Sequence, residues 1–364
     1  MKKKLILAAA LLSAAFSTVK ATEGINLIGI GPVQQGTAGA GVASAKDSTW
    51  LILNPAGLTD VGRQVDASFQ AFAPYRTVDY GAGKQSDNSA FFIPSLSASL
   101  GCCKNDSGYL GIGLYGTSGM GVDYNGGPLG SRTELSVAKM TLTYAKDLGD
   151  GWSVGAGPIF VLSRLRTDMM GQSDSWDTAS GVGAIFGVNK KVNDKLKVGA
   201  SYMSEQFMTE FDEYNALLPD SLNLPQQLTV GLAYDIRTNL EFALDYRWVG
   251  WNKLETLGDQ FGWEDQRIVK AGLTWNATER LTLRTGISHG NSPIGSEDVF
   301  LNSLFPAIMK THLATGISYA FDRVTLNLAY IHALNTEETA TGMGAGTKIS
   351  MYQNSLTLGA NWKF

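Results

Sequence analysis

An alternation of period two runs through most of this chain and restricts its fold more than any other feature. From about residue 64 to the C-terminus, apolar side chains recur at every second position, as at Leu240, Phe242, Leu244 and Tyr246. Polar or small residues such as Asp245 stand between them. Successive side chains of a β-strand point to opposite faces, so the pattern predicts strands with one apolar and one mixed face. By this criterion the chain holds about fourteen strands.

The connections between the predicted strands alternate in length. Short links occur, for example, at residues 147–151, 191–194 and 276–279. Longer links lie between them, such as 76–88, 205–225, 290–307 and 335–347. Outer-membrane barrels have short periplasmic turns, long extracellular loops and girdles of aromatic residues, and many apolar faces here end in Tyr, Trp or Phe. The sequence therefore predicts an all-β fold, a transmembrane antiparallel β-barrel of about 14 strands.

Composition is consistent with a membrane barrel and excludes several other classes. Charged residues make up 17% of the chain, against about 25% in an average soluble protein. Glycine contributes 42 of 364 residues. After the first 21 residues, no apolar run approaches the roughly 20 residues that a membrane-spanning helix needs. These features exclude disorder, collagen, a coiled coil and a helical membrane bundle.

The N-terminus has the features of an export signal. Residues 2–4 are lysines, residues 5–16 are mostly apolar, and Val19-Lys20-Ala21 forms a small-x-small cleavage site. We expect cleavage of residues 1–21 and export to the outer membrane of a Gram-negative bacterium. Cleavage removes four lysines and no acid, which takes the formal net charge from −4 to −8. No basic footprint for nucleic acid is left.

The residues that most often carry chemistry are few. The only cysteines are the neighbours Cys102 and Cys103, which can form only a strained ring; their redox state stays open. The three histidines, His289, His312 and His332, are scattered along the chain. Neither a catalytic triad nor a metal site is predicted from such a set. We expect no catalytic residue, no metal and no cofactor.

The segment from residue 22 to about residue 62 lacks the alternation and predicts a hatch that plugs the lumen. A fourteen-stranded barrel is too wide to be filled by side chains of its own wall. The segment is rich in Gly and Ala, which allow close backbone packing. It ends in the tight turn Asn54-Pro55-Ala56-Gly57-Leu58. The expected organisation is a signal peptide at 1–21, a hatch at 22–62 and a barrel at 63–364.

Several motifs resemble, in order, those of the FadL family of outer-membrane transporters for long-chain fatty acids and hydrocarbons. They are the glycine-rich stretch 35–47, the turn at 54–58, the stretches 224–234 and 245–254, and the terminal Phe364. The resemblance covers essentially the whole mature chain. It implies passive import of a hydrophobic molecule, with capture at the outer loops, passage past the hatch and lateral release through a kink in the third strand.

This resemblance assigns two sets of candidate residues near the hatch. The hatch and gating segment is Asn54, Pro55, Ala56, Gly57 and Leu58. A glycine inside a strand often marks a bend or a close backbone approach. The third strand carries several, and making room for the hatch explains them equally well; they are Gly108, Gly111, Gly113 and Gly116.

Large apolar residues in two outer loops predict a hydrophobic capture surface. Extracellular loops rarely expose so many of them, although packing of a short helix on neighbouring loops is an equally good explanation. The residues are Phe207, Met208, Phe211, Leu217, Leu218, Phe300, Leu304 and Phe305.

Four cations on predicted lumen faces are candidates for binding a carboxylate head group: Arg164, Arg166, Arg284 and Lys310. Arginine is well suited to carboxylates, but ordinary lining of a wet lumen is an alternative role for all four. At residues 259–263, where some family members carry a Lys/Glu pair, this chain has Asp259 and Phe261. That departure favours a less polar substrate, such as an alkane or a monoaromatic.

Together these features predict import of hydrophobic molecules, with long-chain fatty acids as the first candidate substrate. Uptake of alkanes or monoaromatic hydrocarbons is the alternative, and a structural or assembly barrel without transport is a second one. The expected partners are the hydrophobic solute, outer-membrane lipid, lipopolysaccharide and the barrel assembly machinery. We expect a monomer that is not an enzyme and binds no nucleic acid. Whether the hatch moves is left open.

Overall fold

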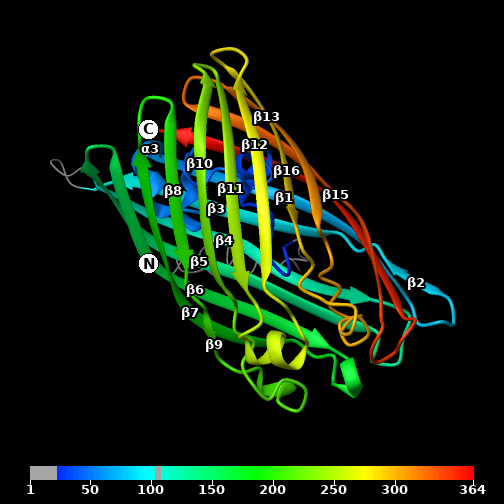
Figure 1. Ribbon diagram of the computed structural model, residues 1–364. Helices are drawn as coiled ribbons and strands as arrows, with labels where there is room; N and C mark the ends of the chain where they lie inside the picture. The colour runs from blue at the N-terminus through cyan, green and yellow to red at the C-terminus, as the bar shows by residue number, and fades with distance from the viewer. Residues whose placement is uncertain (1–22, 103–107) are drawn as a thin grey trace.

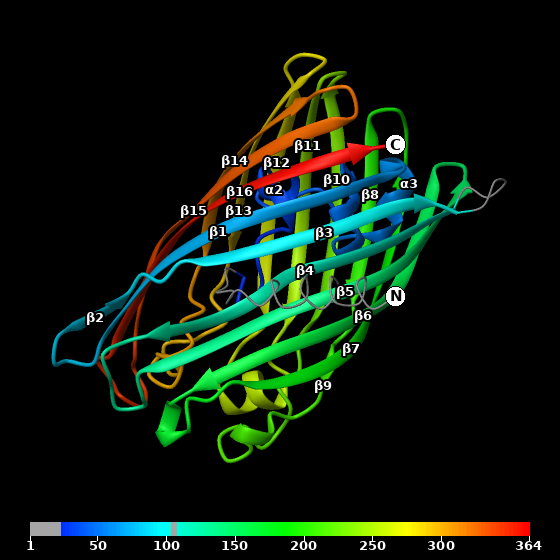
Figure 2. The same cartoon turned by 180° about the vertical axis from the view of Figure 1, so that it is seen from behind.

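Fourteen antiparallel strands form a closed ring within the part of the chain that the structure, a computed structural model, describes, residues 23–102 and 108–364 (Figures 1 and 2). The predicted barrel is thereby confirmed. The expected signal peptide, residues 1–21, lies outside the described residues. The strands of the ring are β1 (Gln64–Asp79), β3 (Phe91–Gly101), β4 (Gly108–Asp123), β5 (Arg132–Gly149), β6 (Trp152–Thr167), β7 (Asp177–Lys191), β8 (Leu196–Met203), β10 (Gln226–Arg237), β11 (Leu240–Gly250), β12 (Gln266–Asn276), β13 (Leu281–Gly290), β14 (Thr311–Ala320), β15 (Val324–Thr339) and β16 (Lys348–Lys363).

Two short strands lie beside this ring. β2 (Lys84–Asp87) folds back on β1, and β9 (Phe207–Met208) pairs with β7. β1 itself continues to Asp79 and β15 to Thr339, where the alternation predicted loops from about 76 and 335. Backbone pairing in these hairpins needs no apolar face, so it extends past the point where the period-two signal ends.

The outer face of the ring is apolar, as expected for a surface in contact with lipid. On β11, Leu244 and Tyr246 are exposed outward, whereas Glu241 and Asp245 contact the hatch inside. Exposed aromatic residues stand next to the short turns and form a girdle at that end. They are Trp152, Tyr234, Trp275, Tyr319 and Trp362. No helix of the described residues is long and apolar enough to span a membrane.

The N-terminal segment fills the ring at the end that carries the short turns (Figures 1 and 2). This hatch is described from Glu23 to Gly62, and almost all of its side chains are buried. It consists of turns and four short helices, because small residues allow a compact path without regular strands. The helices are α2 (Gly31–Gln35), η1 (Ser48–Ile52), η2 (Pro55–Gly57) and α3 (Leu58–Val61).

Polar side chains of the wall hold the hatch on several sides. Asp245 on β11 accepts hydrogen bonds from the backbone amides of Gly41 and Val42, at 2.8 and 2.9 Å. Glu241, four residues earlier on the same face of β11, accepts from Ser44 and Lys46. Buried polar groups need such partners. Further bonds join Asn54 to Asn189 on β7, Ser48 to Asp66 on β1, Gln35 to Gln70 on β1, and Lys197 on β8 to Asp60.

The long loops close the opposite end and contain their own short helices. Their apolar side chains form one buried cluster with those of the barrel wall near the long loops, and this cluster extends through the lumen to the start of the hatch. The helices are η3 (Met169–Gly171), η4 (Asp212–Tyr214) and the π-helical turn η5 (Glu255–Gln260).

Candidate functional site

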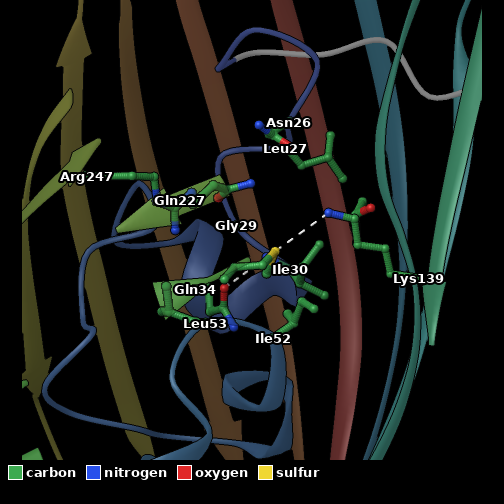
Figure 3. A pocket seen from close by; sticks show the side chains of 12 residues that line it. Asn26, Leu27, Gly29, Ile30, Gln34, Ile52, Leu53, Lys139, Gln227 and Arg247 are labelled. Carbon is green, nitrogen blue, oxygen red and sulfur yellow. Dashed lines mark hydrogen bonds between the residues drawn. The ribbon is translucent and has the colours of Figure 1, made fainter. Parts of the chain in front are cut away.

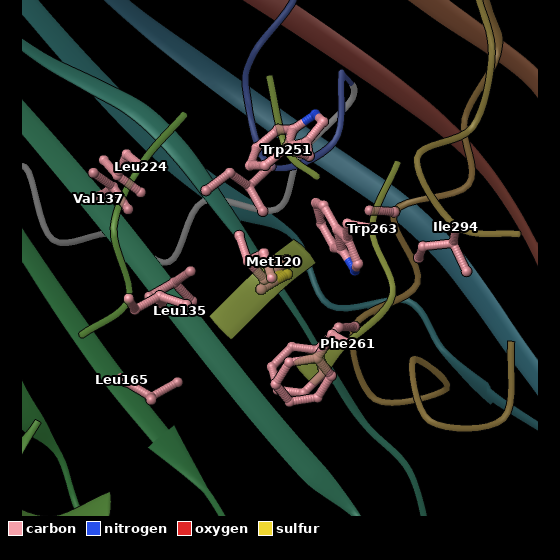
Figure 4. Packing of buried hydrophobic residues seen from close by; sticks show 14 of the residues in the cluster. Met120, Leu135, Val137, Leu165, Leu224, Trp251, Phe261, Trp263 and Ile294 are labelled. Carbon is pink, nitrogen blue, oxygen red and sulfur yellow. The ribbon is translucent and has the colours of Figure 1, made fainter. Parts of the chain in front are cut away.

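An apolar pocket lies beneath the outer loops, against the lumen face of β4, β5 and β6. Figure 4 shows Met120, Leu135 and Leu165 of these strands facing Phe261 of the loop after β11. Leu217 and Leu218 of the β9–β10 loop and Phe305 of the β13–β14 loop complete the wall. Thr167 is the one polar residue in the lining; the remaining members are Leu222 and Leu257.

Contacts between aromatic residues and one buried amide fix the roof of this pocket. Phe261 and Phe305 pack edge to face with ring centroids 5.1 Å apart. Trp263 donates from Nε1 to Asn302 at 2.7 Å and packs against Trp251, with centroids 4.9 Å apart. Such edge-to-face pairs are a favoured aromatic geometry. These contacts fix the roof, and the free space beneath it is about 10 Å³, so a ligand enters only when side chains of the lining move apart.

The predicted capture residues divide between this pocket and its surroundings. Leu217, Leu218 and Phe305 line it. Met208, Phe211 and Leu304 are buried in the same apolar cluster. Phe300 is partly buried against this cluster and packs edge to face on Tyr80, with ring centroids 6.2 Å apart. Phe207 differs from all of these, because 62% of its surface is exposed.

A second, polar cavity of about 50 Å³ lies between the hatch and the wall. Figure 3 shows Lys139 reaching in from one side and Arg247 from the other, with Gln34 of the hatch between them. The remaining lining residues are Asn26, Leu27, Gly29, Ile30, Ile52, Leu53, Thr117, Met203 and Gln227.

Lys139 is a buried cation without an acidic neighbour. Its side chain is 2% exposed, and Nζ donates to Gln206 at 2.7 Å and lies 3.7 Å from the sulfur of Met203. Within the described residues no carboxylate lies at salt-bridge distance from it. A buried charge normally has a partner of opposite sign. Its neighbour Arg247 is neutralised by Glu23, with Nη1 and Oε2 3.0 Å apart.

The two cavities lie one above the other along β5. Leu135, Val137 and Lys139 project from one face of this strand, with Leu135 in the apolar pocket and Lys139 in the polar cavity. Four residues of strand span about 13 Å. The apolar pocket thus lies above a buried cation, at a separation that a hydrocarbon chain can bridge.

Glu23 fixes the start of the hatch beside this polar cavity. Lys270 on β12 lies 2.7 Å from Oε1, and Ser288 on β13 donates at 3.3 Å. Burial opposes ionisation of Glu23, but Lys270 and Arg247 outweigh it and hold the pKa of this carboxyl below its ordinary value of 4.5. The charged form is therefore the stable one at neutral pH.

The four cations proposed from the sequence do not form one cluster, and none of them lines either of these cavities. Arg164 and Arg166 both stack on Trp176, and Arg166 is also paired with Glu134. Lys310 is paired with Glu338 at 2.6 Å. Arg284, for its part, packs against the hatch and donates to Ser318. Sequence reasoning passed over Lys139, although a lysine on the otherwise apolar face of Leu135 and Val137 is a visible signal.

The wall has a gap between β3 and β4. These strands pair from Gly101–Tyr109 up to Ser95–Tyr115. Farther toward the long loops, Phe91–Pro94 of β3 pairs with β1, and Gly116–Asp123 of β4 pairs with β5. Within the described residues the ladder between β3 and β4 does not resume.

Where β4 is no longer paired with β3, the hatch binds the free edge of β4. Leu27 donates to the carbonyl of Thr117 at 3.0 Å, and Gly119 donates to Ile25 at 2.9 Å. The pairing of β4 with β5 shifts register at the same place, between Gly116 and Ser118. A bulge of this kind bends a strand and redirects its side chains.

The glycines proposed for a kink have different neighbours. Gly116 borders the register shift. A Cβ at Gly111 would lie 2.0 Å from Leu51 of the hatch, whereas Gly113 and Gly108 lie against the rings of Tyr115 and Tyr144. Gly111 thus makes room for the hatch.

The Asn54–Leu58 turn anchors the hatch to β6 and β7. Asn54 caps η2 by accepting from Ala56 at 3.1 Å and donates to Val42 and Asn189 at 2.8 Å each. Gly155 and Gly187 of the wall leave space for Pro55 and Asn54. In this arrangement the motif is a fixed contact between hatch and wall.

Comparisons with known proteins point to one group. The profile of the family described as "Outer membrane protein transport protein (OMPP1/FadL/TodX)" matches residues 166–361. The long-chain fatty acid transport protein of Salmonella typhi is 22% identical in an alignment of length 297 that covers 63% of this chain and 67% of that protein.

Solved structures share the whole architecture. The crystal structure of the P. putida toluene transporter TodX has a TM-score of 0.76 at 17% identity and covers 93% of this chain and 99% of its own. That of a Pseudomonas aeruginosa FadL homologue has a TM-score of 0.74 at 13% identity, over 94% of this chain and all of the other. These similarities establish the fold, a fourteen-stranded barrel with a hatch.

Proposed function

Since this chain belongs to the OMPP1/FadL/TodX family of outer-membrane transport proteins, we propose that it imports long-chain fatty acids through the bacterial outer membrane. Membership makes it an outer-membrane transporter of hydrophobic molecules and not an enzyme. The choice of substrate within that class is the proposal.

Lys139 is the observation that supports a carboxylate. It is buried, it has no acidic partner among the described residues, and it borders an open polar cavity. About 13 Å above it along β5 lies a pocket lined by apolar side chains. A fatty acid whose tail enters that pocket, by displacing side chains of the lining, brings its carboxylate toward Lys139, where a charge-assisted hydrogen bond is strong.

We propose release through the wall rather than through the hatch. Movement of the whole hatch would break its bonds to Asp245, Glu241, Asn189 and Asp66, which are spread around the ring. The gap between β3 and β4 leads sideways. An acyl chain is more favourably housed in bilayer hydrocarbon than in water, so lateral diffusion needs no energy source.

Import of an uncharged hydrocarbon is the second candidate. It is supported by the apolar pocket beneath the outer loops, whose lining contains no charged side chain. For a molecule such as toluene the polar cavity would be bypassed and Lys139 would have no role. The two candidates therefore differ in their dependence on this residue.

Uptake of labelled oleate and labelled toluene by cells without their own transporter tests both. With Lys139→Met we expect oleate uptake to fall about tenfold or more, since a hydrogen bond to a charged group contributes about 1.5–3 kcal/mol, and toluene uptake to stay unchanged. Lys195→Met, on a short turn, is the matched control. Toluene uptake alone would assign the hydrocarbon function. Uptake of neither by correctly inserted protein would leave a structural barrel.

Processing and assembly complete the proposal. Cleavage after Ala21 leaves Thr22 as the mature N-terminus, a hatch at 22–62 and a barrel at 63–364; the intact mass of protein extracted from outer membranes tests this. The chain inserts with the barrel assembly machinery, contacts membrane lipid and lipopolysaccharide, and acts as a monomer.

A further inference from the structure

Arg76 is a buried cation near the gap in the wall, and the proposed function assigns it no role. It lies on β1, and its side chain is 1% exposed. Nη2 donates to Asp87, the last residue of β2. Asp87 also accepts from the backbone amide of Asp123 at 2.9 Å, so it spans from β1 to the outer end of β4. Arg76 is thereby placed at the outer limit of the gap.

Most of the donor capacity of Arg76 is unused. Nε and Nη1 are buried and have no hydrogen-bond partner within the described residues. These two nitrogens carry most of the N–H groups of a guanidinium. Leaving buried donors unsatisfied is costly, and a native protein that does so usually has a water, an ion or a ligand to place there.

A small cavity adjoins this guanidinium. It is lined by Gly24 of the hatch, Met120 and Gly121 of β4, Pro306 and Ala307 of an outer loop, and Met351 of β16. Met120 also lines the apolar pocket, so the two spaces are neighbours. The cavity measures about 10 Å³, which is the room for one water. A larger group enters by displacing Met120 and Met351, whose unbranched side chains adapt readily.

We infer that Arg76 is a second binding site for the substrate carboxylate, located at the gap between β3 and β4 and separate from Lys139. This inference rests on the proposed import of fatty acids. A carboxylate in the cavity would accept from Nε or Nη1 while its chain lies along Phe91 and Ile93, which are buried on β3 at the gap. The ring of Phe91 already lies 5.8 Å from the guanidinium carbon.

Asp87 sets the strength of this site. It shares the guanidinium with the incoming anion and repels it, so the substrate is held weakly enough to leave. A transport site must be favourable enough to fill and weak enough to empty. Neutralising Asp87 is therefore expected to strengthen binding, whereas a purely structural ion pair would be weakened by loss of either partner.

Carbon-13 NMR of oleate labelled at the carboxyl carbon, bound to the full-length protein in lipid nanodiscs, tests the inference. We expect two bound carboxylate signals. Lys139→Met removes one of them and Arg76→Gln removes the other, while Arg280→Gln on a short turn leaves both. With Asp87→Asn the second signal is expected to saturate at an oleate concentration several-fold lower. The heat-dependent mobility of the barrel in gel electrophoresis verifies folding of each variant.

Retention of both signals in Arg76→Gln, or an unchanged or weaker second signal in Asp87→Asn, would overturn the inference. Where Arg76→Gln does not fold, the Asp87→Asn titration decides alone. A single signal that depends on Lys139 would overturn this second site and leave fatty acid import standing. No bound carboxylate in the wild type would overturn both.

Discussion

At the scale of single residues, the cations of the lumen differ in what surrounds them rather than in where the sequence places them. Arg166 and Lys310 each meet a carboxylate, whereas Lys139 meets an amide and a thioether. Alternation along a strand predicts that each of these side chains faces the lumen. It does not predict depth or partners, because these depend on the register of neighbouring strands. The candidate site was therefore only partly predictable.

Glu23 gives a prediction about pH. The pKa of this carboxyl is lower in the folded chain than its ordinary value of 4.5, so ionisation stabilises the attachment of the hatch. That stabilisation is complete above the pKa of the unfolded chain and is lost as pH falls through the folded value. We expect hydrogen exchange at the Leu27 and Gly119 amides, which bond the hatch to β4, to accelerate between pH 6 and pH 3 after correction for its intrinsic pH dependence.

A Glu23→Gln variant serves as the control for this measurement. It lacks the titrating group, so its corrected exchange at these two amides is expected to be fast already at pH 6 and to change little on acidification. Equal protection of wild type and variant at pH 6 would show that the ion pairs with Lys270 and Arg247 do not hold the segment.

At position 121 the backbone has room for no residue other than glycine. Its φ is +144°, and a Cβ there would lie 1.9 Å from the carbonyl oxygen of Thr133 on β5. Gly121→Ala is expected to reduce the folded fraction of the barrel. Gly126→Ala, with φ of +118° and no atom within 4 Å, separates conformational strain, about 1–3 kcal/mol, from collision. Urea titration of folded barrel on gels measures both, and equal effects would contradict the collision.

At the scale of elements, the strands were predictable and the interruption between two of them was not. The alternation of apolar and polar residues, the loop lengths and the glycine content are local signals. They predict fourteen strands and a hatch that contains no regular strand. The separation of β3 from β4 arises where Ile25–Leu27 of the hatch binds β4 in place of β3. A competition between two distant segments for one edge is a tertiary effect, and the glycines near it have other neighbours as well.

The attachment of the hatch can be tested through Asp245. This carboxylate accepts both the Gly41 and the Val42 amides. Asp245→Ala leaves two buried donors unsatisfied, at about 1–3 kcal/mol each, and is expected to loosen the hatch. Planar bilayer recordings should then show ion conductance that the wild type lacks. Asp194→Ala, in an exposed turn, is the control, and a silent Asp245→Ala channel would argue that the other bonds suffice.

At the scale of the whole molecule, the apolar pocket, the polar cavity and the gap in the wall make up the proposed route. Ile93 of β3 is buried beside the gap, whereas Leu96 points outward where β3 and β4 are paired. Ile93→Trp is expected to narrow the gap and to lower oleate uptake several-fold, with Leu96→Trp close to wild type. Equal uptake by both variants, at equal amounts of inserted protein, would rule out this exit.

The many bonds between hatch and wall bear on the permeability of the cell envelope. A pore that opened by expelling its plug would admit ions, detergents and water-soluble antibiotics together with the nutrient. With the plug held by several strands, the hydrophobicity of a solute, and not its size alone, decides whether the barrel admits it. A bacterium can then carry many copies of such a barrel while its surface stays a barrier to hydrophilic poisons.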